Sequence, residues 1–305
     1  MYITKFGLFR TADGRYNKRT RRNQTEGGMG LELELLRAIQ SIANPALDIL
    51  MQGVTILGEA VPLLGVLALI YWGWDKELGR YLIFNIACSI GLNGMIKDAL
   101  CMPRPIGQEG IRTLREHTAT GWSFPSGHTQ STASAWSGLA VATGRRALWG
   151  LAVGLSLLVA FSRMYLGVHW PRDVAAGLLV GFGLSFLSWK LWPKVKDDPR
   201  AFYVVAAVCA LALLYARSPD SRKAAGLILG LALGDHLEQR VIRFTVPSTW
   251  KNRLLRLAVG GALLGAVKLG MSLVWEGPLA EYLSYGVIAF LATAGCPWVF
   301  QRLKL

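Results

Sequence analysis

Long apolar stretches separated by short polar segments dominate the pattern of the chain. A helix needs about 20 mostly apolar residues to cross a lipid bilayer. Stretches of this kind cover residues 54–74, 81–96, 147–161, 173–192, 201–216, 257–275 and 283–300, and weaker ones, richer in small residues, cover 128–143 and 224–235. The pattern therefore predicts an all-α, polytopic transmembrane helical bundle with about nine crossings.

The beginning of the chain has a different pattern. Residues 1–28 are polar and basic, and we expect them to form a disordered tail. Apolar residues then recur at helical spacing, which predicts an amphipathic helix at the membrane surface that ends at Pro45. The residues that carry this spacing are Leu35, Leu36, Ile39 and Ile42.

Composition supports a membrane protein, because 52% of the residues are hydrophobic and only 17% are charged. Soluble domains carry roughly a quarter charged residues. The net charge of +14 raises the question of nucleic-acid binding, but beyond the tail the Lys and Arg residues lie mostly in short loops between apolar stretches. We therefore expect the lipid bilayer as the partner, and no nucleic acid. The four cysteines show no paired spacing and are interpreted as buried thiols.

Three polar motifs interrupt the apolar pattern. They are "KDALCMPRP", which contains Lys97 and Arg104, "FPSGH" at residues 124–128, and "SRMYLGVHWPRD" at residues 162–173. Because successive crossings reverse direction, the segments 98–127 and 162–173 emerge on the same side of the membrane. The pattern predicts that all three motifs meet at one mouth of the bundle.

The residue types in these motifs suit a multiply charged oxyanion. Three cations, Lys97, Arg104 and Arg163, accompany a Ser-Gly turn at the start of a predicted helix. Arginine gives bidentate contacts, lysine supplies a point charge, and N–H groups at a helix start bind anions. Phosphate is the natural occupant of such a site.

Two histidines add chemical reactivity to this site. Pro171 suits the first turn of a helix, so that Asp173 can reach back to His169, fix its tautomer and stabilise its imidazolium form. The other ring nitrogen is then free to attack phosphorus, and His128 can protonate the leaving oxygen. The motifs hold no carboxylate cluster for Mg²⁺ or Zn²⁺, so we predict metal-independent chemistry without a cofactor.

K-x6-RP, PSGH and SR-x5-H-x3-D, in this order, resemble the three signature motifs of the type 2 phosphatidic acid phosphatase superfamily, and every motif position is filled. The resemblance implies a membrane lipid phosphatase that works through a phosphohistidine intermediate. It assigns His169 as nucleophile, Asp173 as its partner and His128 as acid. The phosphate ligands that it implies are Lys97, Arg104, Ser126, Gly127 and Arg163.

The resemblance also divides the chain. Residues 29–193 are expected to form the lipid phosphatase membrane core, with roughly six helices. Residues 194–305 are expected to add a transmembrane extension of about four spans, whose role the sequence leaves open.

Several substrates fit the motifs. A short amphipathic helix before the first crossing resembles small bacterial undecaprenyl-diphosphate phosphatases, and we favour undecaprenyl diphosphate. "KDALCMPRP" also resembles the first motif of sphingoid-base phosphate phosphatases, and phosphatidate and phosphatidylglycerophosphate stay open. A lipid transporter or scramblase with a phosphate-binding pocket is the non-enzyme alternative. Vanadium haloperoxidases share such a pocket but are soluble. The oligomeric state, including a homo-oligomer, stays open as well.

Basic residues predict which side of the membrane the site faces. The loops opposite the motifs carry more Lys and Arg than the motif-side loops once the motif cations are set aside. The positive-inside rule therefore favours an extracytoplasmic active site in the cell membrane. The basic tail contradicts this orientation unless the native chain starts at Met29, which we favour, or residues 31–52 form an additional crossing.

Other polar residues receive structural interpretations. His117 is expected to be a solvated loop histidine, and Arg112 and Arg115 either contact a headgroup or lie in a plain polar loop. Glu59, inside an apolar stretch, is a functional hypothesis without a partner. One group resembles metal ligands but is interpreted as a solvated helix end: Asp235, His236 and Glu238.

Overall fold

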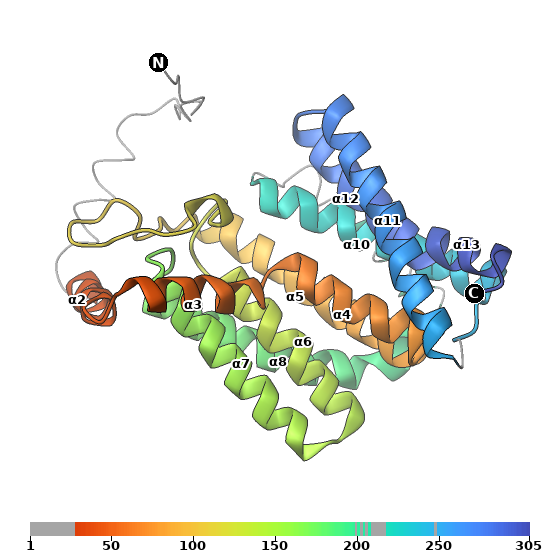
Figure 1. Cartoon of the computed structure of the whole chain (residues 1–305), viewed down its shortest axis with the longest axis horizontal. Helices are drawn as coiled ribbons and strands as arrows, with labels where there is room; N and C mark the ends of the chain where they lie inside the picture. The colour runs from red at the N-terminus through yellow and green to blue at the C-terminus, as the bar shows by residue number, and fades with distance from the viewer. Residues whose placement is uncertain (1–27, 199, 202–203, 205–206, 209–217, 247–248) are drawn as a thin grey trace.

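The computed structural model describes residues 28–198, 200–201, 204, 207–208, 218–246 and 249–305, and every regular element within these ranges is helical. The predicted all-α architecture is confirmed (Figure 1). The elements are α2 (Gly28–Gln40), α3 (Pro45–Ile56), α4 (Ala60–Gly73), α5 (Lys76–Leu100), η1 (Glu116–Thr118), α6 (Gly127–Thr143), α7 (Arg146–Tyr165), α8 (Pro171–Val195), α10 (Pro219–Leu237), η2 (Glu238–Ile242), α11 (Trp250–Val274), α12 (Pro278–Phe290), η3 (Leu291–Gly295) and α13 (Cys296–Arg302).

Four described segments are long and apolar enough to cross a bilayer, namely α7, α8, α11 and the continuous run Pro278–Arg302. Taken together, α3 and α4 would make a fifth. The chain is thus a multi-span membrane protein. Of the other predicted crossings, α5, α6 and α10 are helices that fall short of this measure, and 201–216 lies largely outside the described residues. The sequence therefore predicts more crossings than the described helices support.

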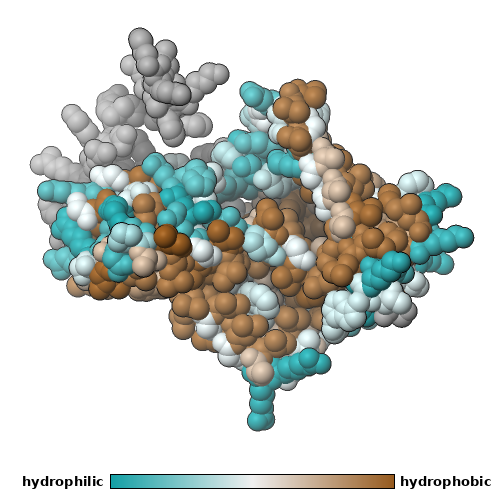
Figure 2. Space-filling model, in the orientation of Figure 1, coloured by the Kyte–Doolittle hydropathy of each residue, from teal (hydrophilic) through white to brown (hydrophobic). Residues whose placement is uncertain are grey.

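The surface of the molecule is divided into an apolar middle and polar ends. Figure 2 shows hydrophobic residues over the middle of the bundle, including α4 and α7, and hydrophilic residues at its ends, such as the α6–α7 turn and the region of α2. This distribution suits a protein whose middle faces lipid and whose ends face water.

The prediction of one continuous crossing over residues 54–74 is wrong. The helix stops at Ile56, restarts at Ala60, and bends by 44° between the two halves. Gly58 lets the break lie against the bundle, because a Cβ there would come within 2.9 Å of Thr132 Oγ1 and of Val159 Cγ1. The apolar composition of residues 54–74 predicts contact with lipid, but it does not predict a break that depends on contacts of Gly58 with Thr132 and Val159.

The amphipathic helix predicted before Pro45 is α2. It ends at Gln40, and Pro45 begins α3 after an Asn44 cap whose side chain accepts from Leu47 N. The helix is also attached to the core, because Leu36 is buried and Gln40 Nε2 donates to Tyr165 O at 2.8 Å.

Polar side chains hold the middle of the bundle together. Asn85 Nδ2 on α5 donates to Ser134 O on α6 at 2.7 Å, and Ser188 Oγ on α8 donates to Asn85 Oδ1 at 2.8 Å. Gln130 Nε2 donates to Ser89 O at 2.7 Å. Such hydrogen bonds between helices fix their register where lipid offers no alternative partner.

Glycines bring α8 against α6. A Cβ at Gly177 would lie 2.9 Å from Ser126 O, and one at Gly181 would lie 2.7 Å from Gln130 O. The two backbones therefore approach closely beside the motifs at the start of each helix.

Glycines also allow close backbone contact between the C-terminal helices α10 and α12. Gly226 and Gly230 recur four residues apart on α10, and a Cβ at either would lie 2.0 Å from Tyr282 O or Gly286 O of α12. This small-residue stripe makes α10 and α12 a closely packed pair (Figure 1).

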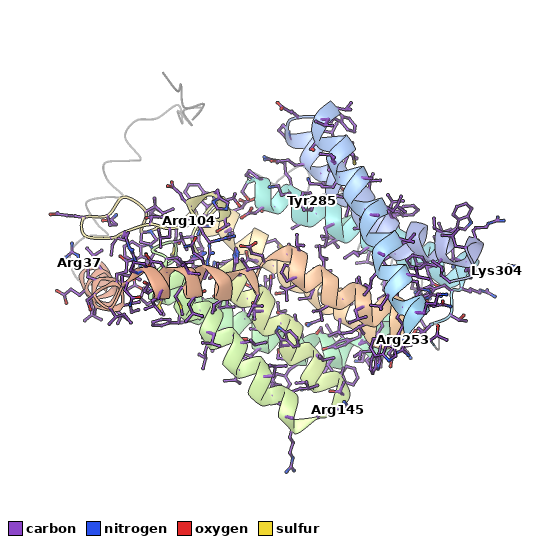
Figure 3. The ribbon with its side chains drawn as sticks, in the orientation of Figure 1. Arg37, Arg104, Arg145, Arg253, Tyr285 and Lys304 are labelled. Carbon is purple, nitrogen blue, oxygen red and sulfur yellow. The ribbon has the colours of Figure 1, made fainter. Side chains whose placement is uncertain are left out.

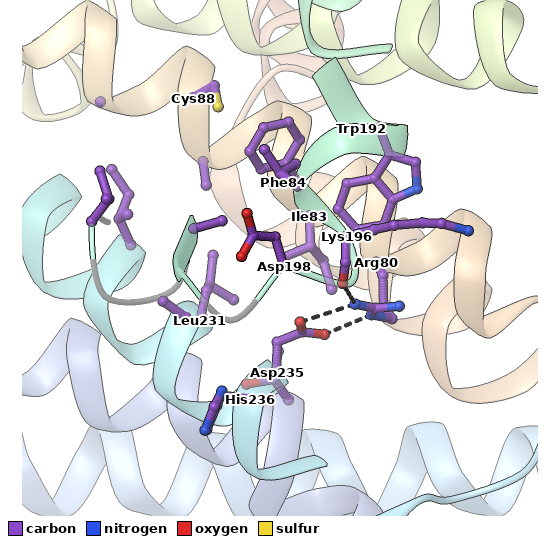
Figure 4. Close-up of a pocket in the computed structure, with 18 of the residues that line it drawn as sticks. Arg80, Ile83, Phe84, Cys88, Trp192, Lys196, Asp198, Leu231, Asp235 and His236 are labelled. Atoms are coloured by element: carbon purple, nitrogen blue, oxygen red, sulfur yellow. Dashed lines mark hydrogen bonds and ion pairs between the residues drawn. The ribbon is translucent and has the colours of Figure 1, made fainter. Parts of the chain in front are cut away.

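The interpretation of Asp235, His236 and Glu238 as a solvated helix end is wrong for Glu238, whereas Asp235 and His236 are half-buried. Glu238 is fully buried and accepts from Lys76 Nζ at 2.6 Å and from Phe244 N at 2.9 Å. Asp235 pairs with Arg80 Nε at 2.8 Å, as Figure 4 shows. The basic partners Lys76 and Arg80 lie on α5, and residue spacing along α10 and η2 does not reveal them. The Arg80–Asp235 pair borders a cavity of about 560 Å³ between α5, α8 and α10.

Candidate active site

The three motifs meet at one end of the bundle, as predicted. Lys97 lies near the end of α5, Arg104 in the 101–126 loop, Ser126 to His128 at the start of α6, Arg163 near the end of α7, and His169 directly before α8. Figure 3 shows Arg104 at this end and Arg145 at the other.

Helix capping positions the His169 segment. Pro171 is the first residue of α8, and Asp173 Oδ2 accepts from Trp170 N at 2.8 Å in the first turn. Ser126 N donates to Asp173 O at 2.9 Å, which ties the start of α6 to the start of α8. The local sequence thus places a carboxylate one turn after the histidine.

The two nitrogens of His169 have different neighbours. Nδ1 lies 3.2 Å from Asp173 Oδ2, whereas Nε2 lies 2.9 Å from Arg104 Nη1. A guanidinium can only donate, so Nε2 is the acceptor and Nδ1 carries the proton that faces Asp173. This is the tautomer that the sequence predicts, with the Nε2 lone pair away from the carboxylate.

Burial keeps His169 neutral. The residue is 1% exposed, and desolvation, followed by the charges of Arg104 and Arg163, lowers the pKa of its imidazole well below the usual value. The unprotonated imidazole, which is the nucleophilic form, therefore predominates at neutral pH.

Ser123 is a contact that the motifs do not reveal. Its hydroxyl is buried and donates to Asp173 Oδ2, and its Oγ lies 3.4 Å from His169 Nδ1. It helps to hold the carboxylate in place. No spacing rule marks Ser123, because it lies in an irregular loop.

Arg104 is held entirely by the protein. Its guanidinium donates to His169, to Val168 O at 2.9 Å, and to three carbonyls of the 101–126 loop, those of Thr120, Gly121 and Trp122. Burial lowers the pKa of Arg104 to about 10, which leaves it charged at neutral pH. A phosphate would have to replace some of these acceptors.

Arg163 is fully buried and only partly satisfied. Nη1 donates to Thr55 Oγ1 at 3.0 Å, while Nε and Nη2 have no hydrogen-bond partner among the described residues. The same holds for His128 Nε2 and Arg115 Nε. Buried donors without acceptors are costly, and an oxyanion would satisfy them.

Arg115 lies in this group although it matches no motif. Its Nη2 donates to Glu59 Oε1 at 2.5 Å, which gives Glu59 the partner that the sequence did not supply. Arg112 instead pairs with Asp48 at 2.7 Å, and His117 is exposed. A left-handed backbone at Arg115 turns the loop here, and sequence periodicity does not predict such a turn.

Lys97 is 4% exposed, and its Nζ donates to Asp220 Oδ2 at 3.0 Å. No sequence motif marks Asp220, which belongs to α10. Ser126, the N-cap residue of α6, contacts Thr129 Oγ1 at 3.0 Å, so its side chain does not cap the N–H groups that begin with Gly127. Among the described residues, no three His, Cys, Asp or Glu side chains group as metal ligands.

The arrangement therefore offers buried cations, a neutral imidazole whose Nε2 lone pair faces Arg104, and a second histidine. All eight predicted site residues lie within residues 78–197, which match the family model described as "PAP2 superfamily". Residues 222–305 match a second one, "PAP2 superfamily phosphatase, transmembrane extension". Asp220 lies between the two matched regions.

Two similar relatives carry the name undecaprenyl-diphosphatase. The protein of Sulfolobus acidocaldarius is 31% identical over 164 residues, 53% of this chain and 79% of that protein. BcrC of Bacillus subtilis is 31% identical over 164 residues, 52% of this chain and 83% of that protein. A dihydrosphingosine 1-phosphate phosphatase of Schizosaccharomyces pombe is 29% identical over 179 residues, 52% of this chain and 42% of that protein.

Proposed function

The chain belongs to the PAP2 superfamily of membrane phosphatases, and from this membership we propose that it hydrolyses a lipid phosphate or diphosphate through a phosphohistidine on His169. Nε2 of His169 bonds to phosphorus as the bond to the lipid oxygen breaks, and protonated His128 gives that oxygen a proton and becomes neutral. Water then attacks phosphorus, the P–N bond breaks, and neutral His128 accepts the proton from water. Orthophosphate and the dephosphorylated lipid leave.

The observation that carries this proposal is that Arg163 Nε and Nη2 and His128 Nε2 are buried without hydrogen-bond partners among the described residues, close to His169. A trigonal-bipyramidal phosphoryl group would accept from them as its equatorial oxygens gain charge, which is the main source of phosphoryl-transfer catalysis. Lys97 and Arg104, both from the motif "KDALCMPRP", add two further cations. The proposed chemistry uses these side chains where other phosphatases use metal ions, so it requires no metal.

The proposed substrate is undecaprenyl diphosphate. Two relatives named for that activity support it, as does an orientation in which the pocket faces the extracytoplasmic side of the cell membrane. A sphingoid-base phosphate is the second candidate, favoured by the relative from Schizosaccharomyces pombe. Phosphatidate and phosphatidylglycerophosphate share the same phosphate chemistry.

The charge pattern supports the orientation. At the end opposite the pocket, the turns and helix ends carry Lys76, Arg80, Arg145, Arg146, Lys194 and Lys196. The positive-inside rule counts Lys and Arg near the membrane whether or not carboxylates lie beside them, so it favours this end as the cytoplasmic one.

The test measures phosphate release by detergent-purified protein and by its His169→Ala variant, with EDTA present throughout. The substrates are undecaprenyl diphosphate, phosphatidate, phosphatidylglycerophosphate and sphingosine 1-phosphate. We expect release by the wild type alone, fastest with undecaprenyl diphosphate. Loss of the wild-type rate in EDTA would reject metal-independent chemistry. Equal release by the variant would reject His169 as nucleophile, and no release from any lipid would favour the transporter alternative.

A further inference from the structure

A carboxylate of the C-terminal helices reaches the phosphate pocket. Asp220 lies in the first turn of α10, after the Ser218 cap and Pro219. An acidic residue there is ordinarily a favourable helix-end charge. This side chain instead crosses to the phosphatase core, where Oδ2 accepts from Lys97 Nζ at 3.0 Å and Oδ1 accepts from Thr120 Oγ1 at 3.0 Å.

The surroundings of Asp220 are those of the pocket. Its Oδ2 would lie only 3.0 Å from a Cβ at Gly121, a residue whose positive φ of 62° also favours glycine. The carbonyls of Thr120 and Gly121 accept hydrogen bonds from Arg104. The carboxylate thus touches one pocket cation directly and borders the loop that holds a second.

The Asp220 carboxylate accepts a hydrogen bond from Lys97 as a bound phosphate oxygen would. The Lys97 side chain is 5% exposed and meets one carboxylate oxygen, while a hydroxyl meets the other. An oxyanion with two oxygens on an ammonium and a hydroxyl resembles part of a phosphate-binding site. A phosphate that binds Lys97 therefore competes with the Asp220 carboxylate for the Lys97 ammonium group.

We propose that Asp220 is a positioning residue that holds Lys97 in the empty pocket and weakens phosphate binding there, so that the C-terminal extension sets the phosphate affinity of the catalytic core. This inference rests on the proposed function for the role of Lys97. Like charges close together in a poorly solvated site repel strongly, so a fixed carboxylate opposes a bound phosphate dianion. The consequence for catalysis is faster release of the orthophosphate product.

The competing explanation is a structural ion pair that fastens α10 to α5. The chain offers a matched control for it, because Asp235 on the same helix pairs with Arg80 of α5 at 2.8 Å, far from the pocket motifs. Asp220→Asn and Asp235→Asn each remove one α10–α5 ion pair and keep the side-chain shape. Only the first changes the charge beside Lys97.

The experiment measures the dissociation constant of orthophosphate for the full-length protein in detergent by titration calorimetry, a readout that needs no turnover. We expect Asp220→Asn to bind orthophosphate about tenfold more tightly than wild type, and Asp235→Asn to stay within about twofold. Thr120→Val, which removes the other partner of Asp220, is expected to shift affinity in the same direction by a smaller factor. In a Lys97→Met background, the Asp220→Asn effect is expected to shrink.

Unchanged or weaker orthophosphate binding by Asp220→Asn would overturn the inference, and so would an equal gain in Asp235→Asn. If Asp220→Asn does not fold, an unchanged or weaker affinity in Thr120→Val overturns it instead. Tighter binding by Asp220→Asn in a protein that releases no phosphate from any lipid would support the inference and reject the proposed function. Phosphate release with the predicted affinity gain absent would reject the inference alone.

Discussion

At the scale of single residues, one hydrogen bond decides how His169 can react. Because Arg104 donates to Nε2, the proton must be on Nδ1 facing Asp173. The motif spacing predicts the Asp173 contact, since i and i+4 residues meet across a helix start. It does not predict Ser123 or Arg115, which reach the site through irregular backbone.

The lowered pKa of His169 leads to a prediction about pH. Protonated imidazole cannot attack phosphorus, so kcat/KM falls only as pH drops through the pKa of the free enzyme, and burial with nearby cations moves that pKa below the usual value of about 6.5. We expect kcat/KM with an aryl phosphate, whose leaving group needs no proton, to hold from neutral pH to below 6.5. Arg104→Gln should move this acid limb to higher pH, because it removes a charge that disfavours the imidazolium.

The measurement is a pH–rate profile for wild type, Arg104→Gln and Arg104→Lys. The lysine variant keeps the charge and serves as the control for altered packing. An acid limb that stays in place in Arg104→Gln would show that Arg104 does not act on His169 through its charge.

At the scale of elements, close helix packing holds the motifs in register. Gly181 on α8 has no room for a side chain, because a Cβ there would lie 2.7 Å from Ala133 Cβ and from Gln130 O on α6. Gly183 on the same helix is exposed, with nothing within 4 Å of a Cβ. The sequence shows both as glycines in one apolar stretch and cannot distinguish them.

We expect Gly181→Ala to destabilise the protein by about 1–3 kcal/mol, as overpacking does, and to lower kcat by moving His169 away from the start of α6. Gly183→Ala should be neutral or stabilising by up to about 1 kcal/mol, because alanine is the better helix former. Thermal unfolding midpoints in detergent and phosphate-release rates check both. Equal effects of the two substitutions would mean that the α6–α8 contact does not position the site.

At the scale of the whole molecule, the bundle separates two chemically different ends. One holds the three motifs, and the other carries Arg145 and Lys304 (Figure 3). The close approach of α10 to α5, at Gly91 and Gly94, joins the C-terminal extension to the core, so that Asp220 can reach Lys97.

The orientation of the molecule can be tested by labelling. In a variant whose native cysteines are replaced by serine, we expect Gln108→Cys, in the exposed 101–126 loop, to react with a membrane-impermeant maleimide in intact cells. Arg145→Cys, exposed at the other end, should react only after permeabilisation. The reverse labelling pattern would put the pocket on the cytoplasmic side.

The sequence by itself determined the all-α membrane class and the meeting of the three motifs. The membrane class follows from the length of the apolar stretches, which matches the thickness of a bilayer. The meeting of the motifs follows because successive crossings reverse direction, which puts alternate loops on the same side. The roles of the eight motif residues stay predictions. Tertiary structure alone decided the break after Ile56, the burial of Glu238 and the approach of Asp220 to Lys97. Each of these depends on a contact with a residue far away in the sequence, and the spacing of residues within one segment does not predict such contacts.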